Sequence, residues 1–203
     1  MKKFFSLLIL LCLCCGGGKE EPPAVTQESD TSQIAKSILM VIAPKDFRDE
    51  EFKEPYELFT KSGINVTVAS TDTSPAKGVL GMVVKPELTL EQINPDNFDA
   101  LVVVGGPGCQ VLWDDTTLHK IVQSFNEAEK TIAAICIAPV VLARAGILKD
   151  MKVTVYPSVQ DEIGICGAHY TGSDVEVSGN IITCSGPKAA KDFANTILNT
   201  LSQ

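Results

Sequence analysis

Short apolar runs alternate with longer polar stretches along this chain. Five runs, rich in apolar and β-branched residues, predict strands of a buried sheet over 37–43, 65–70, 98–106, 131–135 and 152–158. Residues 82–86 predict a further short strand, and 175–184 predict two strands about a Ser-Gly-Asn turn. Apolar positions at helical spacing predict helices over 51–62, 117–128, 139–145 and 187–201. Strands that alternate with helices indicate an α/β fold, with a doubly wound, mostly parallel sheet flanked by helices.

Residues 1–15 are expected to form an export signal. Lys2 and Lys3 precede an apolar run that ends at Cys15, too short for the ~20 residues of a membrane span. The cysteines at its end, followed by three glycines, resemble a bacterial lipoprotein signal, in which the cysteine at the cleavage point is lipidated. Cys15 is favoured as that residue, with Cys14 as the alternative. An ordinary cleaved signal, or a poorly cleaved anchor, stays open.

The rest of the chain divides into a tether and a domain. Residues 16–34 contain Gly, Pro and small polar or acidic residues without periodicity, which is typical of a flexible linker. Residues 35–203 hold all the predicted strands and helices. We therefore expect an exported lipoprotein of the bacterial cell envelope, whose only contact with the membrane is its lipid anchor.

Charge and composition narrow the function classes. The 203 residues include 25 acidic and 17 basic ones, a net charge of −8, which argues against a nucleic-acid partner. The domain has two histidines, and its four cysteines match neither a CxxC nor a zinc spacing, so neither a metal nor a cofactor is predicted. An even number of cysteines outside the cytoplasm permits two disulfides, but we expect mainly free thiols at Cys109, Cys136, Cys166 and Cys184.

The candidate chemistry concentrates at Cys136. This residue directly follows a buried strand and precedes a helix, with small residues, Ala134 and Ala138, two positions away on each side. A nucleophile on a sharp strand-to-helix turn needs such small neighbours, and the positive end of the helix dipole would lower its pKa. The Gly105-Gly106 amides, at the end of another strand, could form an oxyanion pocket. The alternative is a small buried cysteine that closes a strand.

Several segments, in order, resemble the DJ-1/PfpI family over about residues 37–201. They are the acidic segment FRDEEFKEP, then GINVTVAS, VVVGGPG, AAICIAP and the closing GAHYTGSDVEVSGNIITCSGPKAAKDFA. The resemblance implies a flavodoxin-like fold of the DJ-1/PfpI type, a homodimer, and a reactive cysteine at Cys136. It also implies that Glu51, four residues before Pro55, hydrogen-bonds the thiol and transfers protons. From the charge run alone, Glu51 would be a solvated residue.

The chain departs from the family pattern around the cysteine. Protease-like members have His after the Cys, where this chain has Ile137, whose amide we add to the oxyanion pocket. Tyr156 stands where other members place a His, and Leu80 falls near the position of an Arg that caps oxidised cysteine. Tyr156 and Trp113 are candidate substrate contacts, with plain packing as the alternative, whereas His119 and His169 are expected to be structural. The missing His argues against peptide hydrolysis.

Three functions are consistent with these residues. The first is a metal-free enzyme of the glyoxalase or deglycase type, in which Cys136 attacks a small electrophilic carbonyl and Glu51 moves the proton. The second is an oxidation-stress sensor, whose Cys136 is oxidised to sulfenic and sulfinic acids. The third is a chaperone-like binding protein with a structural cysteine.

Overall fold

The computed structural model describes residues 36–203. The predicted export signal, its lipidation site Cys15 and the predicted tether lie outside the described residues. They stay predictions.

A seven-stranded sheet forms the centre of the domain, in the order β11-β12-β8-β7-β1-β3-β6. All neighbouring strands are parallel except β11, which runs antiparallel to β12. The strands are β1 (Ser37–Val41), β3 (Asn65–Ser70), β6 (Leu88–Thr89), β7 (Ala100–Val103), β8 (Thr131–Ile135), β11 (Val175–Ser178) and β12 (Ile181–Cys184). The expected α/β fold with a mostly parallel sheet is confirmed.

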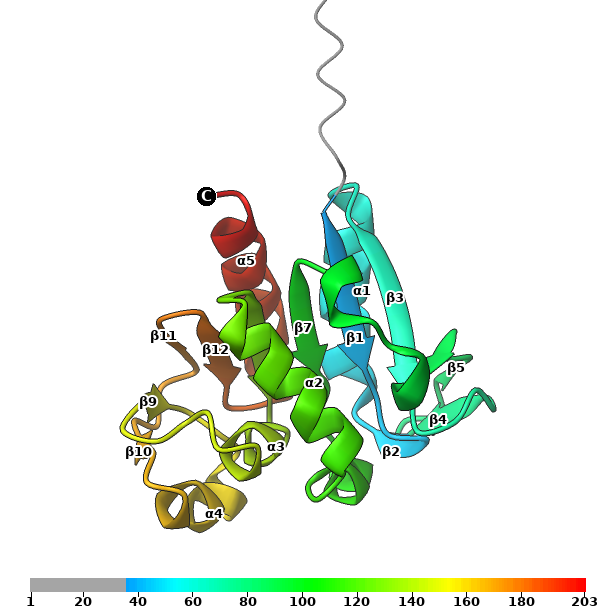
Figure 1. Ribbon diagram of the computed structural model, residues 1–203. Helices are drawn as coiled ribbons and strands as arrows, with labels where there is room; N and C mark the ends of the chain where they lie inside the picture. Colours follow the sequence, from blue (N-terminus) through cyan, green and yellow to red (C-terminus); the bar gives the residue numbers. More distant parts are fainter. Residues whose placement is uncertain (1–35) are drawn as a thin grey trace, which may run out of the picture. The chain divides into compact units, whose positions relative to one another are not determined.

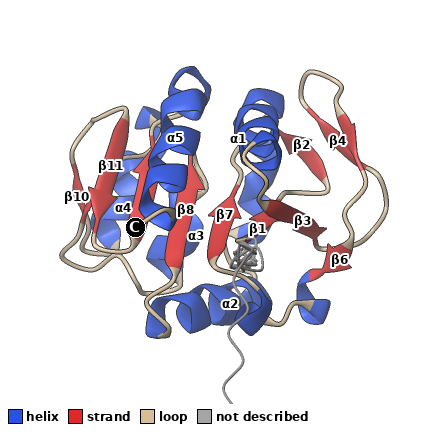
Figure 2. Cartoon of the chain, turned by 90° about the horizontal axis from the view of Figure 1, so that it is seen from above, coloured by secondary structure: helices blue, strands red, loops and turns tan. Residues whose placement is uncertain are grey.

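Helices cover both faces of this sheet (Figures 1 and 2). α1 and α5 pack together on one face, and α2 packs with α3 on the other, with α4 against α3. The helices are α1 (Asp49–Lys61), α2 (Thr116–Glu127), α3 (Pro139–Arg144), α4 (Gln160–Ile165) and α5 (Ala190–Leu201). Short 3₁₀ turns occupy Leu90–Gln92, Pro95–Asn97, Pro107–Leu112, Pro157–Val159 and Pro187–Ala189.

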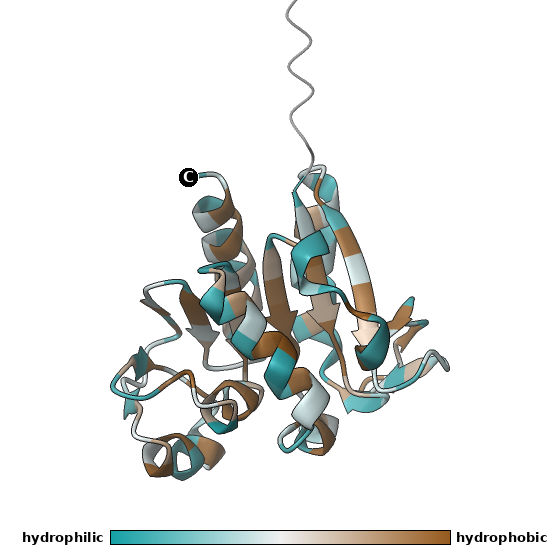
Figure 3. Ribbon diagram, in the orientation of Figure 1, coloured by the Kyte–Doolittle hydropathy of each residue, from teal (hydrophilic) through white to brown (hydrophobic). Residues whose placement is uncertain are grey.

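The core lies between the central strands and the helices. Every residue of β7 and β8 is buried, because helices cover both faces of these strands. Figure 3 shows the same pattern as continuous apolar colour along the central strands. Phe59 of α1 and Phe193 of α5 are fully buried on one side, and Phe125 of α2 on the other. The sheet is therefore a rigid support for the loops at its ends.

Two small sheets flank the large one. β2 (Lys45–Phe47), β4 (Ala76–Gly78) and β5 (Val83–Val84) form one, and β9 (Lys152–Val153) and β10 (His169–Tyr170) form the other. The strand predicted over 152–158 is wrong beyond Val153. The Thr154 amide donates to the Thr183 hydroxyl at 2.9 Å, and the Tyr156 amide donates to the Cys136 carbonyl at 2.9 Å. The chain thus leaves the ladder and turns at Pro157 toward Cys136.

The order of the strands determines where a ligand-binding crevice forms at the edge of the sheet. The chain goes from β1 outward to β3 and later returns to place β7 on the other side of β1. The loops after β1 and β7 therefore leave in opposite directions and open a crevice at the carboxyl ends of the strands, where such folds bind ligands. The loops after β1, β7 and β8 carry the residues singled out above.

Candidate active site

Cys136 occupies a strained turn between β8 and α3. Its φ is 64°, in the left-handed region that residues with a side chain rarely adopt. Two backbone hydrogen bonds hold it there: its amide donates to the Cys184 carbonyl at 2.8 Å, and its carbonyl accepts from Tyr156. Ala134 and Ala138 are fully buried on either side. The surrounding structure thus imposes a conformation that directs the thiol out of the sheet.

Glu51 lies in the first turn of α1 and is fully buried beside Cys136. Gly105 separates the two groups. A Cβ on Gly105 would lie 2.6 Å from Glu51 Oε2 and 2.7 Å from the Cys136 Cβ. The bare backbone of Gly105 is therefore what allows the carboxyl and the thiol to approach each other.

The neighbouring acidic residues have other partners. Asp49 accepts hydrogen bonds from the amides of Leu80 and Met82, both at 2.7 Å, and so anchors the β4–β5 hairpin. Glu50 forms an ion pair with Arg48 at 2.8 Å. Of the three acidic residues in this turn, Glu51 alone lines the pocket that contains the thiol.

Burial and mutual repulsion set the charge state of the Glu51–Cys136 pair. Burial raises the pKa of Glu51 to about 7, although the Cys136 thiol, the Arg48 charge and the Gly105 amide lower it. Burial and the Glu51 charge raise the pKa of Cys136 well above its ordinary value, against the lowering effect of the Gly106 and Ile137 amides. The expected lowering of the thiol pKa is therefore wrong, because α3 has only six residues and cannot offset burial and a neighbouring carboxylate.

The three predicted backbone donors divide between the two groups. The amides of Gly106 and Ile137 face the Cys136 sulfur, whereas the amide of Gly105 faces the Glu51 carboxyl. Among the described residues, neither Glu51 oxygen has a well-aligned hydrogen-bond partner. A buried carboxyl whose neighbouring donors are poorly aligned is costly, so this group is poised to accept a hydrogen bond, or a proton, from a molecule in the pocket.

A cavity of about 390 Å³ opens over the thiol. The structure brings Glu51, Gly106, Cys136, Ile137 and Tyr156 together at this cavity. Its other lining residues, which the sequence interpretation missed, are Arg48, Pro107, Gln110, Ser158, Val159 and Pro187. Nothing in the acidic segment FRDEEFKEP distinguishes Arg48 as a cavity residue, because it is one of several charged residues there. Ser158 and Val159 belong to the 3₁₀ turn Pro157–Val159, whose first two residues fall in the strand predicted over 152–158.

Trp113 does not line the cavity and contacts the turn that holds Cys136 instead. Its Nε1 donates to the Ile137 carbonyl at 3.2 Å, and its ring packs 5.0 Å from the Arg144 guanidinium. His119 contacts the Trp113 carbonyl through Nε2 at 2.8 Å, while His169 lies on the exposed strand β10. Neither histidine lines the cavity.

Trp113→Phe is expected to lower the free energy of unfolding by about 1 kcal/mol. The change keeps an aromatic ring beside Arg144 but removes the donor to the Ile137 carbonyl. Chemical denaturation with a matched variant, Tyr170→Phe, measures the effect. An unchanged denaturation midpoint in Trp113→Phe would show that the hydrogen bond contributes nothing to the turn.

The pKa of Glu51 makes folding stability depend on pH. The folded state keeps a proton on this carboxyl between its ordinary pKa of 4.5 and about pH 7, whereas the unfolded chain has released it. Stability from this group is therefore present at low pH and is lost as pH rises through that window. Relative to wild type, Glu51→Gln should gain stability between pH 5 and 8, by up to about 3 kcal/mol.

Thermal unfolding of wild type and Glu51→Gln at pH 5 and at pH 8 measures this gain in stability. The control is Glu54→Gln, an exposed carboxyl on the same helix, which should follow the wild-type pH dependence. If the difference between Glu51→Gln and wild type is the same at pH 5 and pH 8, Glu51 has an ordinary pKa.

The other three cysteines of the described part do not line the cavity over Cys136. All four cysteines of the described part are free, with Cys109 and Cys184 buried and Cys166 half-buried. Burial raises the pKa of Cys109 and Cys184, which keeps both thiols protonated.

Within residues 36–203, no three His, Cys, Asp or Glu side chains are placed to hold a metal ion. None of the helices in this same range is long and apolar enough to cross a membrane.

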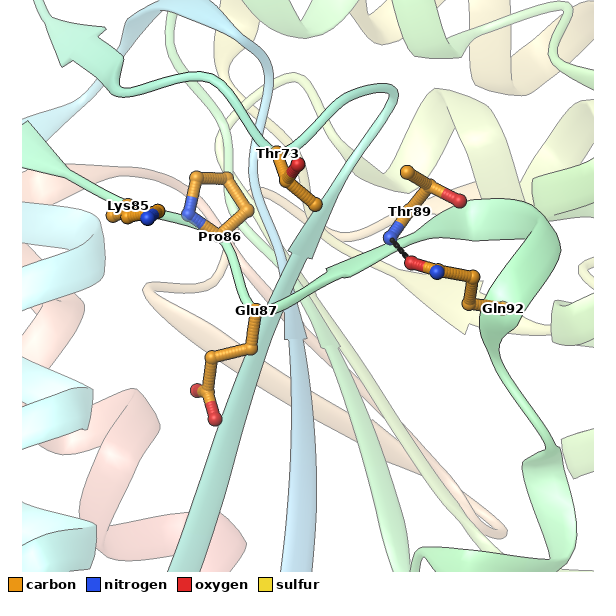
Figure 4. Close-up of a pocket in the computed structure, with 6 residues that line it drawn as sticks. All are labelled: Thr73, Lys85, Pro86, Glu87, Thr89 and Gln92. Carbon is orange, nitrogen blue, oxygen red and sulfur yellow. Dashed lines mark hydrogen bonds between the residues drawn. The ribbon is translucent and has the colours of Figure 1, made fainter.

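A second hollow, of about 550 Å³, lies at the β6 edge of the sheet (Figure 4). Its lining residues are Thr73, Lys85, Pro86, Glu87, Thr89 and Gln92. Gln92 Oε1 accepts from the Thr89 amide at 2.9 Å, and Glu87 accepts from the Val68 amide at 3.1 Å. Two of its polar side chains are thus engaged with backbone, and no cysteine reaches it. The cavity over Cys136 is therefore the stronger candidate for the active site.

Comparison with known proteins agrees with this geometry. The chain is 44% identical over 169 residues to an uncharacterised protein of Methanocaldococcus jannaschii, covering 82% of each. It is 30% identical over 166 residues to the glutathione-independent glyoxalase DJR-1.2 of Caenorhabditis elegans, covering 82% of this chain and 89% of that protein. The crystal structure of a ThiJ/PfpI domain protein from Brachyspira murdochii matches with a TM-score of 0.81 and 34% identity, covering 83% and 97% of the two chains. The sequence model of the DJ-1/PfpI family matches residues 36–200, so the chain belongs to the DJ-1/PfpI family.

Proposed function

We propose that this protein converts small 2-oxoaldehydes to 2-hydroxy acids without glutathione, with Cys136 as the nucleophile and Glu51 as the proton carrier. The observation that carries the proposal is the pairing of a strained thiol with a fully buried carboxyl at one cavity, where neither carboxyl oxygen has a well-aligned hydrogen-bond partner within residues 36–203. The relative named a glutathione-independent glyoxalase supports the same chemistry.

The first step forms a bond between the Cys136 sulfur and the aldehyde carbon. The Glu51 carboxylate takes the thiol proton as the sulfur attacks, which overcomes the high thiol pKa through proton transfer inside the pair. The amides of Gly106 and Ile137 face the reacting sulfur and stabilise the oxyanion beside it. Glu51 then gives its proton to that oxygen, and the product is a neutral hemithioacetal.

The second stage moves one hydrogen between neighbouring carbons. The Glu51 carboxylate removes the proton from the former aldehyde carbon and returns it to the former ketone carbon. The hydroxyl proton passes from the former aldehyde oxygen to the former ketone oxygen, which leaves a thioester on Cys136. Water hydrolyses the thioester to a carboxylate and restores the thiol. The net change is the addition of one water molecule, since one carbon is oxidised while its neighbour is reduced.

A direct test is to incubate the purified protein with methylglyoxal, without glutathione, and to measure lactate. We expect lactate to form at a rate proportional to protein concentration. Consumption of methylglyoxal without lactate would indicate a simple thiol adduct and would overturn the proposal.

Oxidation sensing is a second candidate, supported by the Glu51 oxygens, which have no well-aligned hydrogen-bond partner in the described part of the chain. This carboxyl beside the sulfur could hydrogen-bond a sulfinic acid and stabilise it. Intact mass after mild peroxide tests this function. We expect a gain of two oxygens that Cys136→Ser abolishes, and an unmodified wild-type protein would exclude the sensor.

We further propose that the protein is anchored in the bacterial cell envelope through lipid on Cys15, and that it forms a homodimer. Both proposals rest on sequence resemblance. Detergent partitioning of protein from membranes tests the anchor: Cys15→Ser should move to the aqueous phase, and Cys14→Ser should not. Light scattering of residues 35–203 tests the dimer, and a monomeric mass would contradict it.

A further inference from the structure

Arg48 is the only cation among the described residues that line the cavity, and the steps above give it no role. Its side chain is about one-third exposed, at 33%. Its Nε lies 2.8 Å from Glu50 Oε2, and its Nη2 donates to Glu50 Oε1 at 3.0 Å. The ion-pair geometry leaves the buried Nε without a well-aligned hydrogen-bond partner within residues 36–203, so the guanidinium keeps donors for another acceptor.

The backbone holds Arg48 against the catalytic loops. Its amide donates to the Gly105 carbonyl at 3.0 Å. A Cβ on Gly106 would overlap the Arg48 amide, so the two loops pack backbone to backbone. The Arg48 charge stabilises the ionised forms of both Glu51 and Cys136, and therefore lies within electrostatic range of the reacting groups.

The rest of the cavity is suited to a short carbon chain. Pro107, Val159 and Pro187 supply apolar wall, while the Gly106 and Ile137 amides are beside the thiol. A neutral substrate such as methylglyoxal needs no cation at the cavity. A fixed guanidinium with free donors is the side chain that proteins use to hold a carboxylate.

We propose that Arg48 makes the cavity selective for 2-oxoaldehydes that carry a carboxylate at the far end of the chain. This inference rests on the proposed function and names its substrate class. The carboxylate binds Arg48 in competition with Glu50, and this orients the aldehyde carbon toward the Cys136 sulfur. In a protein of net charge −8, such selectivity needs a local cation, because the overall field repels anions.

A suitable probe is 4,5-dioxopentanoate, which has an aldehyde, a neighbouring ketone and a terminal carboxylate. The sulfur adds to the aldehyde carbon, one proton moves from that carbon to the ketone carbon, and the hydroxyl proton moves to the ketone oxygen. Water then hydrolyses the resulting thioester and releases 2-hydroxyglutarate. The aldehyde carbon is oxidised and its neighbour reduced, so the reaction needs no external oxidant or reductant.

Alkylation of Cys136 tests the anion site without any turnover. Iodoacetate and iodoacetamide react with the same thiolate, so the ratio of their rate constants cancels the reactivity of the thiol and reports anion selectivity. We expect Arg48→Gln to lower the iodoacetate-to-iodoacetamide ratio about tenfold, and Glu50→Gln to raise it about threefold. The matched control is Lys61→Gln, which removes an exposed cation paired with Glu57 and should leave the ratio unchanged.

An unchanged ratio in Arg48→Gln would overturn the inference. Turnover then separates it from the proposed function. We expect the ratio of kcat/KM for 4,5-dioxopentanoate to that for methylglyoxal to fall about tenfold in Arg48→Gln. If both aldehydes react and this ratio is unchanged, the selectivity is overturned while the glyoxalase function stands. If neither reacts but the alkylation ratio depends on Arg48, the anion site stands and the glyoxalase function fails.

Discussion

Cys136→Ser is expected to reduce lactate formation from methylglyoxal by about 10³-fold or more. The hydroxyl is too weak an acid for a carboxylate with a pKa of about 7 to deprotonate. No carbon–sulfur bond can form, and no thioester follows. Steady-state assays at pH 8, together with a search for a covalent adduct by mass spectrometry, measure the loss.

The matched control is Cys166→Ser, a half-buried thiol that does not line the cavity. It should keep near wild-type activity and thermal stability. If Cys136→Ser retains more than about a tenth of the activity, the nucleophile is another group and the assignment of Cys136 fails.

Glu51→Gln is expected to lower kcat/KM by about 10²–10⁴-fold, the usual contribution of a general base. Glutamine keeps the shape of the side chain but cannot take the thiol proton. In wild type, kcat/KM should rise as pH increases through about 7, because the ionised carboxylate is the active form. The variant should lose this rise, and a pH–rate profile from pH 5 to 9 tests both statements.

The control is again Glu54→Gln, which should keep the wild-type profile. A Glu51→Gln variant with an unchanged profile would mean that a different group titrates near neutral pH and carries the proton.

Long apolar runs made most of the fold predictable. The strands at 65–70 and 131–135 were predicted to the residue, because β-branched or small apolar residues lie between clear helix and turn signals. Strands β2, β4 and β6 were missed, since two or three residues are too few for alternation to show. The strand predicted over 152–158 is too long, because its apolar pattern continues past the last residue that pairs in a sheet. The amides of Thr154 and Tyr156 donate to Thr183 and Cys136 instead, and these hydrogen bonds turn the chain away.

The candidate site was predictable where a motif fixes the backbone. The small residues around Cys136, and the spacing of Glu51 from Pro55, identify positions whose local geometry follows from sequence. The direction of the thiol pKa did not follow, because it depends on burial and on a carboxylate 85 positions away in sequence. Arg48 was missed for the same reason: only the packing of its backbone on Gly105 and Gly106 brings it to the cavity.

The two hydrogen bonds that hold the Cys136 turn have a consequence for its motion. One joins the turn to the end of β12, and the other joins it to the segment that follows β9. The turn therefore cannot open unless both elements separate from it together. Amide hydrogen exchange at Cys136 and Tyr156 should consequently be slow, with similar rates at the two positions. These rates would report how often the turn that holds the thiol opens.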